Sequence, residues 1–312
     1  MVAGRFAVAV LALVLARDAS AQWGNWVADS LLAEGRLASA ESAYYAAARQ
    51  KPRDPQSRAA LGRYLAARGG TRAGAVLLEE AQFFGGDSVG LSRLLVPLFV
   101  RLADYEALER LNPPQVLSPV ERRRARWLSQ HRPEARLRDS VALLSYRAIG
   151  DGRGIGTVIV RFGKSEFVAM IDPRVSGVVL PSTARRDVRV FGVDKGATLG
   201  VIDTLRIGPA VFWRVPAVLG NPDESPKIGF DVLAPYYPGF DPARGILTLR
   251  RVARRDPSPQ GIRVPALYDH NGLRVLIGDR WHPTTASGPS MLLATRRWLW
   301  DWKLGDVVLL SP

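Results

Sequence analysis

The sequence predicts a chain with two kinds of structure, an N-terminal array of helical repeats followed by an all-β domain. Between Trp26 and Leu111, alanine and leucine recur at three- and four-residue spacing, which is the period of an amphipathic helix. After Asp139 the chain consists of short apolar or alternating runs separated by glycine, proline, asparagine and aspartate, which is typical of strands and turns. At 312 residues the chain is long enough for both domains.

The composition indicates a folded protein, because 47% of the residues are hydrophobic and only 23% are charged. The formal net charge is +14, and basic runs occur at Glu121–Arg126 and Arg250–Arg255. No aromatic residues are interleaved with these runs, so we expect solvated basic faces and no nucleic-acid partner. The absence of cysteine excludes disulfides, and three histidines without close pairing give no reason to expect a metal or another cofactor.

Residues 1–21 have the pattern of a secretory signal peptide. Arg5 supplies a positive start, Phe6–Ala16 is an apolar stretch too short to span a bilayer comfortably, and Ala19–Ala21 offers a small-x-small cleavage site. We therefore expect a secreted or periplasmic protein with no integral membrane span after cleavage behind Ala21. An uncleaved membrane anchor is the alternative.

Residues 22–116 contain a repeat with a period of 34 residues (74 − 40 = 34). Its members are small or apolar residues that recur in register: Ala40, Tyr44, Ala47 and Pro52, then Gly74, Leu78, Ala81 and Gly86. The stretch AESAYYAAARQKP resembles the tetratricopeptide repeat. That resemblance implies stacked helix pairs, with a weaker third pair over residues 94–111. Such an array either binds a protein or peptide in its groove or serves as a spacer.

A connecting segment is expected over residues 117–138. Ser118 and Glu121 have the spacing of a capping box in front of a helical run, so a helix should begin there.

The β-rich region over residues 139–255 is expected to form a small antiparallel barrel, because no helix-length amphipathic stretch separates its strands. The glycine cluster Gly150–Gly156 lies between two strands and is interpreted as a hairpin turn. Most informative is VAMIDPRVSGVVLP, in which an apolar strand delivers Asp172 into a tight turn and a second apolar strand follows. Two later phrases, DTLRIGPAVFWRVPAVLG and KIGFDVLAPYYPGFDPARGILTLRR, complete the pattern.

The order of these strands and phrases resembles the single-lobe aspartyl proteases, the retropepsin-like family. The resemblance places Asp172 at the catalytic position and implies a homodimer, because acid proteolysis needs two carboxylates that share a proton. The family's Asp-Thr-Gly turn reads Asp172-Pro173-Arg174 here. Proline lacks the hydroxyl and the N–H that the turn uses, and the arginine favours a fully ionised carboxylate. Catalysis is therefore expected to be degenerate, with an active homodimeric peptidase as the alternative.

Residues 256–312 are expected to be either a β-extension or a truncated second lobe. In the second interpretation, Gly272–Arg297 aligns with the first β unit and sets Ser287 and Gly288 opposite the acidic turn, with serine where the chemistry requires aspartate. The segment Trp298–Trp302 alternates tryptophan with other residues, as on a strand, and would either pack in the core or bind a ligand.

Other polar residues offer alternative roles. Asp203 is expected on a strand, and Asp231 and Asp241 are expected in structural turn roles. A nucleophilic site would combine a serine, a histidine and an acid from the C-terminal region, but no G-x-S-x-G elbow is present. Its candidates are Ser287, Ser290, His270, His282 and Asp269.

Together these observations predict an exported protein with an aspartyl-protease-like domain that acts in protein or peptide binding. The alternatives are an active aspartic peptidase that uses Asp172 and a purely structural helical-repeat scaffold.

Overall fold

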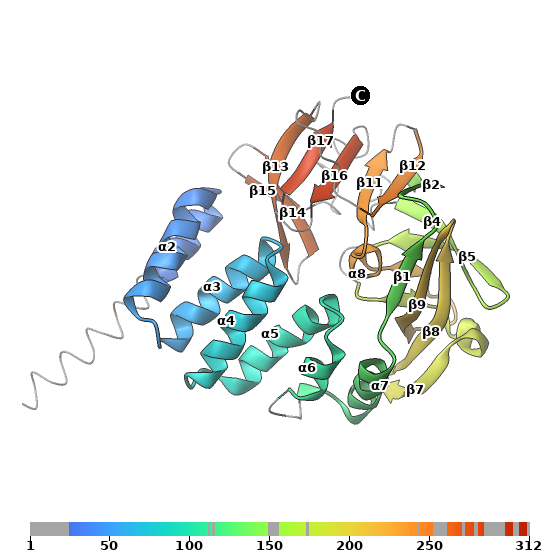
Figure 1. The fold of residues 1–312 in the computed structure, drawn as a ribbon, viewed down its shortest axis with the longest axis horizontal. Helices are drawn as coiled ribbons and strands as arrows, with labels where there is room; N and C mark the ends of the chain where they lie inside the picture. Colours follow the sequence, from blue (N-terminus) through green and yellow to red (C-terminus); the bar gives the residue numbers. More distant parts are fainter. Residues whose placement is uncertain are drawn as a thin grey trace, which may run out of the picture.

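The structure, a computed structural model, consists of a helical array joined to a β-rich region (Figure 1). It describes residues 25–111, 113, 116–148, 156–172, 175–241, 244–251, 261–269, 272–277, 280–283, 297–301 and 306–310. Helices fill the N-terminal part and strands fill the C-terminal part, so the predicted fold class is confirmed. Within the described ranges, no helix is both long enough and apolar enough to cross a membrane.

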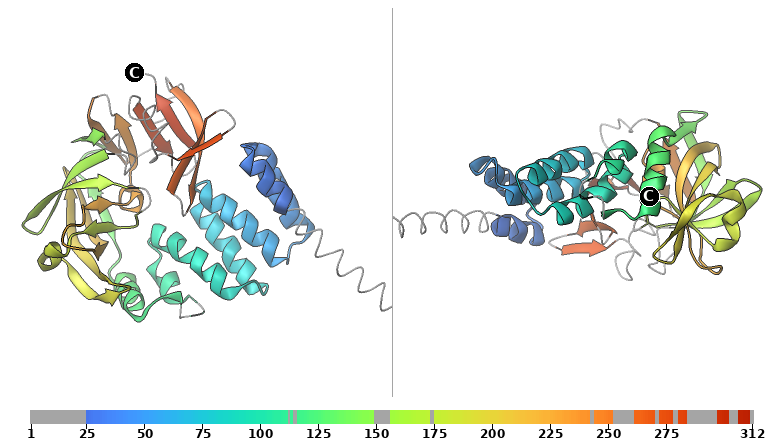
Figure 2. Two further views of the ribbon diagram at one scale, coloured as in Figure 1. Left: turned by 180° about the vertical axis from the view of Figure 1, so that it is seen from behind. Right: turned by 90° about the horizontal axis from the view of Figure 1, so that it is seen from below.

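The N-terminal helices follow one another along the chain, and each packs on the next (Figure 2). A first helix covers residues 25–33. The others are α2 (Leu37–Gln50), α3 (Pro55–Ala67), α4 (Thr71–Phe83), α5 (Ser88–Arg101), α6 (Tyr105–Glu109) and α7 (Pro119–Gln130).

The repeat positions lie in the contacts between these helices. Ala40, Tyr44 and Ala47 are buried on α2, and the residues 34 positions later (74 − 40 = 34) are buried on α4. Small residues at these positions permit close approach: a Cβ on Gly74 would meet the carbonyl oxygen of Gly62 at 2.7 Å. The helix ends are set by local capping, as at α3, where Asp54 accepts a hydrogen bond from the Ser57 N–H at 2.8 Å.

Helix α7 begins as the sequence predicts. The Glu121 N–H donates to Ser118 Oγ at 3.1 Å, and the Ser118 N–H donates to Glu121 Oε2 at 2.7 Å. The predicted capping box is therefore confirmed, and it satisfies two N–H groups at the helix start.

The first sheet joins nine of the described strands in the order β1-β9-β6-β10-β5-β4-β8-β7, with β3 paired to β4. A further pairing of β9 with β8 closes the sheet into a barrel. Contrary to the prediction from the sequence, the barrel is not wholly antiparallel, because β10 pairs with β5 and β6 pairs with β9 in parallel. The strands are β1 (Glu134–Leu137), β3 (Arg147–Ala148), β4 (Gly156–Phe162), β5 (Ser165–Ile171), β6 (Val178–Leu180), β7 (Arg189–Asp194), β8 (Ala197–Ile207), β9 (Ala210–Leu219) and β10 (Lys227–Ile228). A 3-10 helix, Ser182–Asp187, follows β6, and the short helix α8, Phe230–Leu233, follows β10.

Buried and exposed side chains alternate along the strands of the barrel. On β4 the side chains of Val158, Val160 and Phe162 are buried, whereas Ile159 and Arg161 between them face outward. The inward set joins apolar residues of β5, β8 and β9 in one core. One face of each strand therefore fills the barrel, which is why the sequence shows a period of two.

The second sheet is antiparallel and runs in the order β15-β14-β13-β17-β16-β11-β12-β2. Its strands are β2 (Val141–Ser145), β11 (Tyr237–Asp241), β12 (Ile246–Arg250), β13 (Gly261–Asp269), β14 (Gly272–Ile277), β15 (Arg280–Pro283), β16 (Arg297–Asp301) and β17 (Asp306–Leu310). The C-terminal strands thus share a sheet with three strands from the segment 139–255, through the pairing of β16 with β11. The domain limits drawn from the sequence at 255 and 256 stay a prediction.

The C-terminal strands also reach back to the helical array. Arg68 Nη1 on α3 donates to the Ala266 carbonyl on β13 at 2.9 Å, and Trp281 Nε1 on β15 donates to the Leu32 carbonyl at 2.9 Å. The helices, the second sheet and the barrel are consequently arranged around a common central space (Figures 1 and 2).

Candidate functional site

The acidic turn lies where three strands meet. β10 is inserted between β5 and β6, so that Ile228 pairs with both Ile171 and Val178. Asp172 directly follows β5, its N–H donates to the Ile228 carbonyl at 3.0 Å, and the residue is only 2% exposed. The structure therefore places the predicted catalytic aspartate in a buried turn that crossing strands hold.

Its neighbours Pro173 and Arg174 lie outside the described residues. The predicted interference of these two residues with proton sharing therefore stays a prediction, as does the catalytic role of Asp172.

Asp231 braces the same turn from α8. One carboxylate oxygen accepts from Ser176 Oγ at 2.7 Å and from the Gly177 N–H at 2.8 Å, and the other accepts from the Val232 N–H at 3.1 Å. Burial raises the pKa of Asp231 above its ordinary value, whereas these hydrogen bonds and the charge of Arg101 oppose the rise. Asp231 therefore has a structural role, as expected, but it lies in the short helix α8 and not in a turn.

Gly177 is required at this point of the turn. Its φ is +68°, and a Cβ there would meet the Pro216 carbonyl oxygen at 2.4 Å. The Gly229 N–H donates to the Gly177 carbonyl at 2.8 Å, so both the N–H and the carbonyl of Gly177 form hydrogen bonds. Gly177, just before β6, is thus bonded to the segment that joins β10 to α8.

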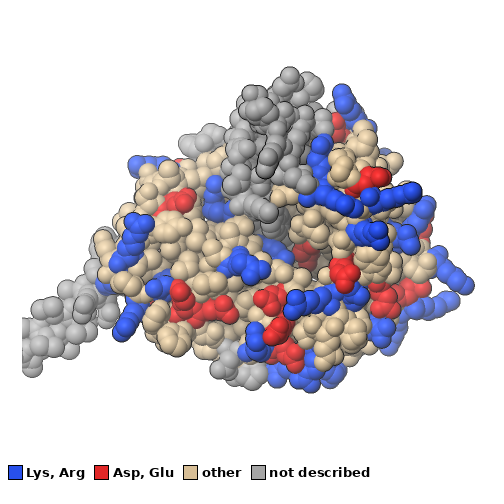
Figure 3. Space-filling view, in the orientation of Figure 1, with Lys and Arg blue, Asp and Glu red and all other residues tan. Residues whose placement is uncertain are grey.

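A cavity of about 660 Å³ lies between the helical array and the barrel. Five segments far apart in sequence line it, at residues 69–73, 100–105, 133–135, 212–216 and 231–235. On the face shown in Figure 3 the surface is hollowed between the helices and the barrel. The volume falls in the range of about 300–1,000 Å³ that ligand pockets occupy, so this cavity is the candidate binding site.

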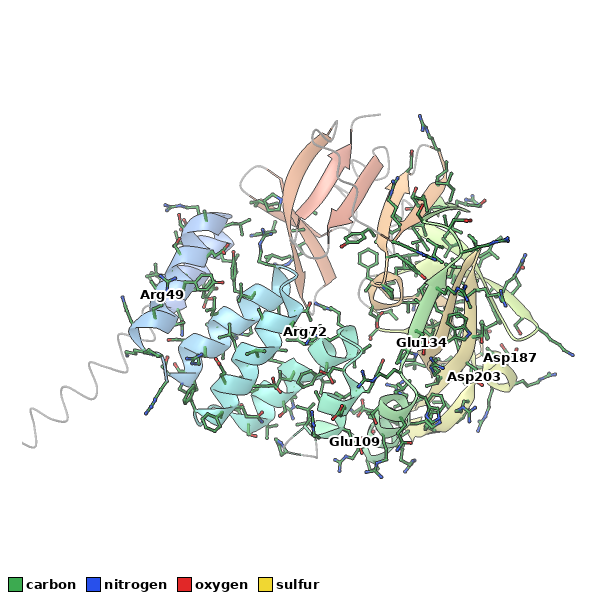
Figure 4. The ribbon with its side chains drawn as sticks, in the orientation of Figure 1. Arg49, Arg72, Glu109, Glu134, Asp187 and Asp203 are labelled. Atoms are coloured by element: carbon green, nitrogen blue, oxygen red, sulfur yellow. The ribbon has the colours of Figure 1, made fainter. Side chains whose placement is uncertain are left out.

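Its walls combine apolar side chains with a few polar groups. Phe212, Trp213 and Val215 of β9 form an apolar wall. Figure 4 shows Arg72 of α4 and Glu134 of β1 on opposite sides of the central space, and both line the cavity. An apolar wall with a small number of polar groups is typical of sites that orient a ligand.

Tyr105 at the start of α6 is a buried polar side chain of the cavity wall, with 5% of the residue exposed. Burial raises the pKa of Tyr105, the negative charge of Asp231 adds to the rise, and Arg124 opposes it. Tyr105 is therefore a neutral hydrogen-bonding group at ordinary pH.

Two backbone outliers border the cavity. Ala103 has a φ of 52° in the turn after α5, and Arg214, next to Trp213, has a φ of 59°. Arg214 is held by an ion pair with Glu134 at 2.5 Å and by a hydrogen bond from its Nε to the Arg132 carbonyl at 2.5 Å. Left-handed conformations at residues other than glycine are often found at ligand sites, because the surrounding contacts must maintain them.

The remaining predicted residues lie elsewhere. Asp203 forms an exposed ion pair with Arg189 on the barrel surface, as Figure 4 places it. Asp241 is buried and accepts from the Arg244 N–H at 3.1 Å, which confirms its turn role. In the described part of the chain, no group of three or more acidic or histidine side chains is arranged to hold a metal ion.

Most of the candidate residues in the C-terminal region have no described side chain. Ser287, Gly288, Ser290 and His270 lie outside the described residues, and His282 and Asp269 are placed on β15 and β13 by their backbone alone. The second-lobe and nucleophilic alternatives therefore stay predictions.

Comparison with known proteins gives a resemblance to solved structures alone. No family model matches the chain, and no curated protein matches it. Among solved structures, the chain is similar to a retropepsin-like aspartic protease from Rickettsia conorii, at 15% sequence identity and a TM-score of 0.26, with 38% of this chain and 92% of that chain covered.

Proposed function

We propose that the protein is exported and binds an extended polypeptide segment in the cavity between its helical array and its barrel. The barrel would be an aspartyl-protease-like domain in which hydrolysis through Asp172 is degenerate. The observation that carries the proposal is the cavity of about 660 Å³ whose wall includes the start of β1.

Strand β1 gives a peptide its main-chain partner. It pairs with β9 on one side and stands at the end of the sheet, so that among the described strands its other edge has no neighbour. Pro133, Glu134 and Ala135 at the start of this strand line the cavity, and Figure 1 shows β1 on the side of the barrel that faces the helices. An extended segment in the cavity could therefore add a strand to the sheet, which supplies affinity that does not depend on its sequence.

Side-chain contacts would come from β9. Trp213 is half-buried and lines the cavity, as does the buried Phe212. Aromatic surface of this kind contributes strongly to recognition, because a large apolar area is buried with little loss of side-chain entropy.

Hydrolysis is less well supported than binding. Acid proteolysis needs a water held between two carboxylates that share a proton. Asp231, the acid that the fold brings to the acidic turn, uses its oxygens to accept from Ser176, Gly177 and Val232 and is thereby committed to holding the turn. An active homodimer that uses Asp172 is the alternative, and the buried position of this residue after β5 is the observation that keeps it open.

A peptide-capture experiment tests the proposal. The purified protein is incubated with a random-sequence peptide pool, and retained peptides are quantified by mass spectrometry. The cavity is blocked by Ala73→Trp, since Ala73 is exposed on α4 and lines the cavity. The matched control is Ala46→Trp, an exposed position on α2 outside the cavity.

We expect the unmodified protein and Ala46→Trp to retain peptides and Ala73→Trp to lose most of them. Retention that Ala73→Trp leaves unchanged would contradict binding in this cavity. If no peptide is retained by any variant, the proposed function fails.

A further inference from the structure

We propose that the cavity contains a binding site for a carboxylate of the bound polypeptide, formed by the N-terminus of α4, Arg72 and the Tyr105 hydroxyl. The inference rests on the proposed function, since it names the chemical group by which the same cavity would anchor its ligand. The geometry that leads to it lies on the helical side, opposite β1.

The first turn of α4 presents free donors to the cavity. Gly70 occupies the N-cap position without a side-chain acceptor, and Thr71, Arg72 and Ala73 follow it. Among the described residues, no acceptor meets the N–H groups of these three. The helix is 13 residues long, so its N-terminus carries a partial positive charge as well as unsatisfied N–H groups, and both favour an anion.

A second observation points to the same ligand. Tyr105 is 95% buried (100 − 5 = 95) and lines the same cavity, yet its hydroxyl forms no hydrogen bond with any residue in the described ranges. An enclosed hydroxyl without a partner is costly unless a ligand or water supplies one. A carboxylate accepts hydrogen bonds from O–H, N–H and guanidinium donors at the same time.

The charges of the cavity favour a group with a single negative charge. Arg72 is exposed at the start of α4 and has no ion-pair partner in the described part of the chain. On the opposite wall Glu134 is neutralised by Arg214. A carboxylate would offset the charge of Arg72, whereas a phosphate dianion would bring more negative charge toward Asp231.

The carboxylate could belong to the C-terminus of the peptide or to an acidic side chain. Two random-sequence peptide pools from one synthesis distinguish these sources, one with free C-terminal carboxylates and one with C-terminal carboxamides. Each pool is captured on the purified protein, and the affinities of the retained peptides are measured by fluorescence anisotropy. The variants are Arg72→Gln and Tyr105→Phe, with Arg93→Gln as the matched control, because Arg93 is exposed on α5 away from the cavity.

We expect free-acid peptides to bind about tenfold more tightly than their amides, as a charged hydrogen-bonding group should. Arg72→Gln and Tyr105→Phe should each remove most of that preference without weakening the amides, and Arg93→Gln should change neither pool. Enrichment of Asp or Glu within the retained amides, lost in Arg72→Gln, would assign the carboxylate to a side chain.

Equal affinity of free-acid and amide peptides, without enrichment of acidic residues, would overturn the carboxylate site while the proposed function stands. The carboxylate site would also be overturned if peptides with a free acid bound more tightly but neither Arg72→Gln nor Tyr105→Phe reduced that preference. Retention of neither pool would instead refute peptide binding itself. Arg72 is exposed, so its variant keeps the test valid even if Tyr105→Phe does not fold.

Discussion

Replacing Asp231 by alanine removes the acceptor that holds the acidic turn. Three donors lose their partner: Ser176 Oγ at 2.7 Å, the Gly177 N–H at 2.8 Å and the Val232 N–H at 3.1 Å. Ser176 is exposed and can bond to water instead, but Gly177 and Val232 are buried. The cost of the substitution is therefore set by two buried N–H groups.

Each buried N–H without an acceptor costs about 1–3 kcal/mol. Part of this loss is offset, because the substitution also removes a carboxylate whose burial disfavours its charge. We expect Asp231→Ala to lower the free energy of unfolding by about 3 kcal/mol in mildly acidic buffer. The control is Asp223→Ala, an exposed position in the loop after β9, which should change the free energy by less than about 0.5 kcal/mol.

The cost should also depend on pH in a defined direction. The pKa of Asp231 is raised above its ordinary value of 3.8, so between the two pKa values the folded protein binds more protons than the unfolded chain. The stability that Asp231 contributes is therefore fully present at pH values below its ordinary pKa. This contribution falls as the pH rises through the raised pKa of the folded protein, by up to about 1.4 kcal/mol per pH unit. The penalty of Asp231→Ala must therefore shrink with rising pH.

The assay is urea unfolding followed by far-ultraviolet circular dichroism at several pH values between 4 and 8, for the unmodified protein and both variants. If Asp231→Ala unfolds at the same urea concentration as Asp223→Ala, Asp231 does not hold the turn. If the penalty grows with pH, the carboxylate is stabilised by its charge and the direction argued from burial is wrong.

Four further substitutions test other local arguments by the same urea assay. Gly177→Ala should cost at least about 2 kcal/mol or prevent folding, because its Cβ would lie 2.4 Å from the Pro216 carbonyl oxygen at a φ of +68°. Gly196→Ala, with a φ of +82° and open space around it, should cost only about 1 kcal/mol, and equal costs would contradict the steric argument. Ala103→Gly should stabilise the protein by up to about 1 kcal/mol, since a φ of 52° suits glycine, and a loss of stability would contradict the assigned strain. Ser118→Ala should cost about 1 kcal/mol through loss of the capping box, and no change would contradict its contribution.

Local sequence signals were sufficient for the helical array. The repeat of small residues at Ala40 and Gly74 predicts close helix contacts, and both positions are buried there. The spacing of Ser118 and Glu121 predicts the start of α7, because a capping box is made within a single turn. Such features depend on neighbours a few residues away, so the chain alone specifies them.

The barrel was predictable as a class, and its topology less so. Alternation along β4 indicates a half-buried strand, but it does not reveal that β10 enters between β5 and β6. The glycine before Phe230 suggested a turn at Asp231, whereas its bonds to Ser176 and Gly177, 55 and 54 positions away, depend on that inserted strand. Contacts at such separation leave no periodic trace in one sequence.

The candidate site itself was not foreseen. Arg72, Tyr105, Glu134 and Trp213 belong to four elements of two different domains, and none of them falls in a recognisable motif. They line one cavity because the helical array and the barrel lie on either side of it. The only signal within the sequence is the absence of an N-cap acceptor at Gly70, which becomes meaningful once Tyr105 is placed beside the same cavity.

The central claim is that this protein holds polypeptides without cutting them. The most direct measurement is mass spectrometry of denatured casein and a random-sequence peptide pool after incubation from pH 3 to 7, with Asp172→Asn protein in parallel. We expect bound peptides to be recovered intact with both proteins. New peptide termini that are produced by the unmodified protein, suppressed by pepstatin and absent with Asp172→Asn would contradict it.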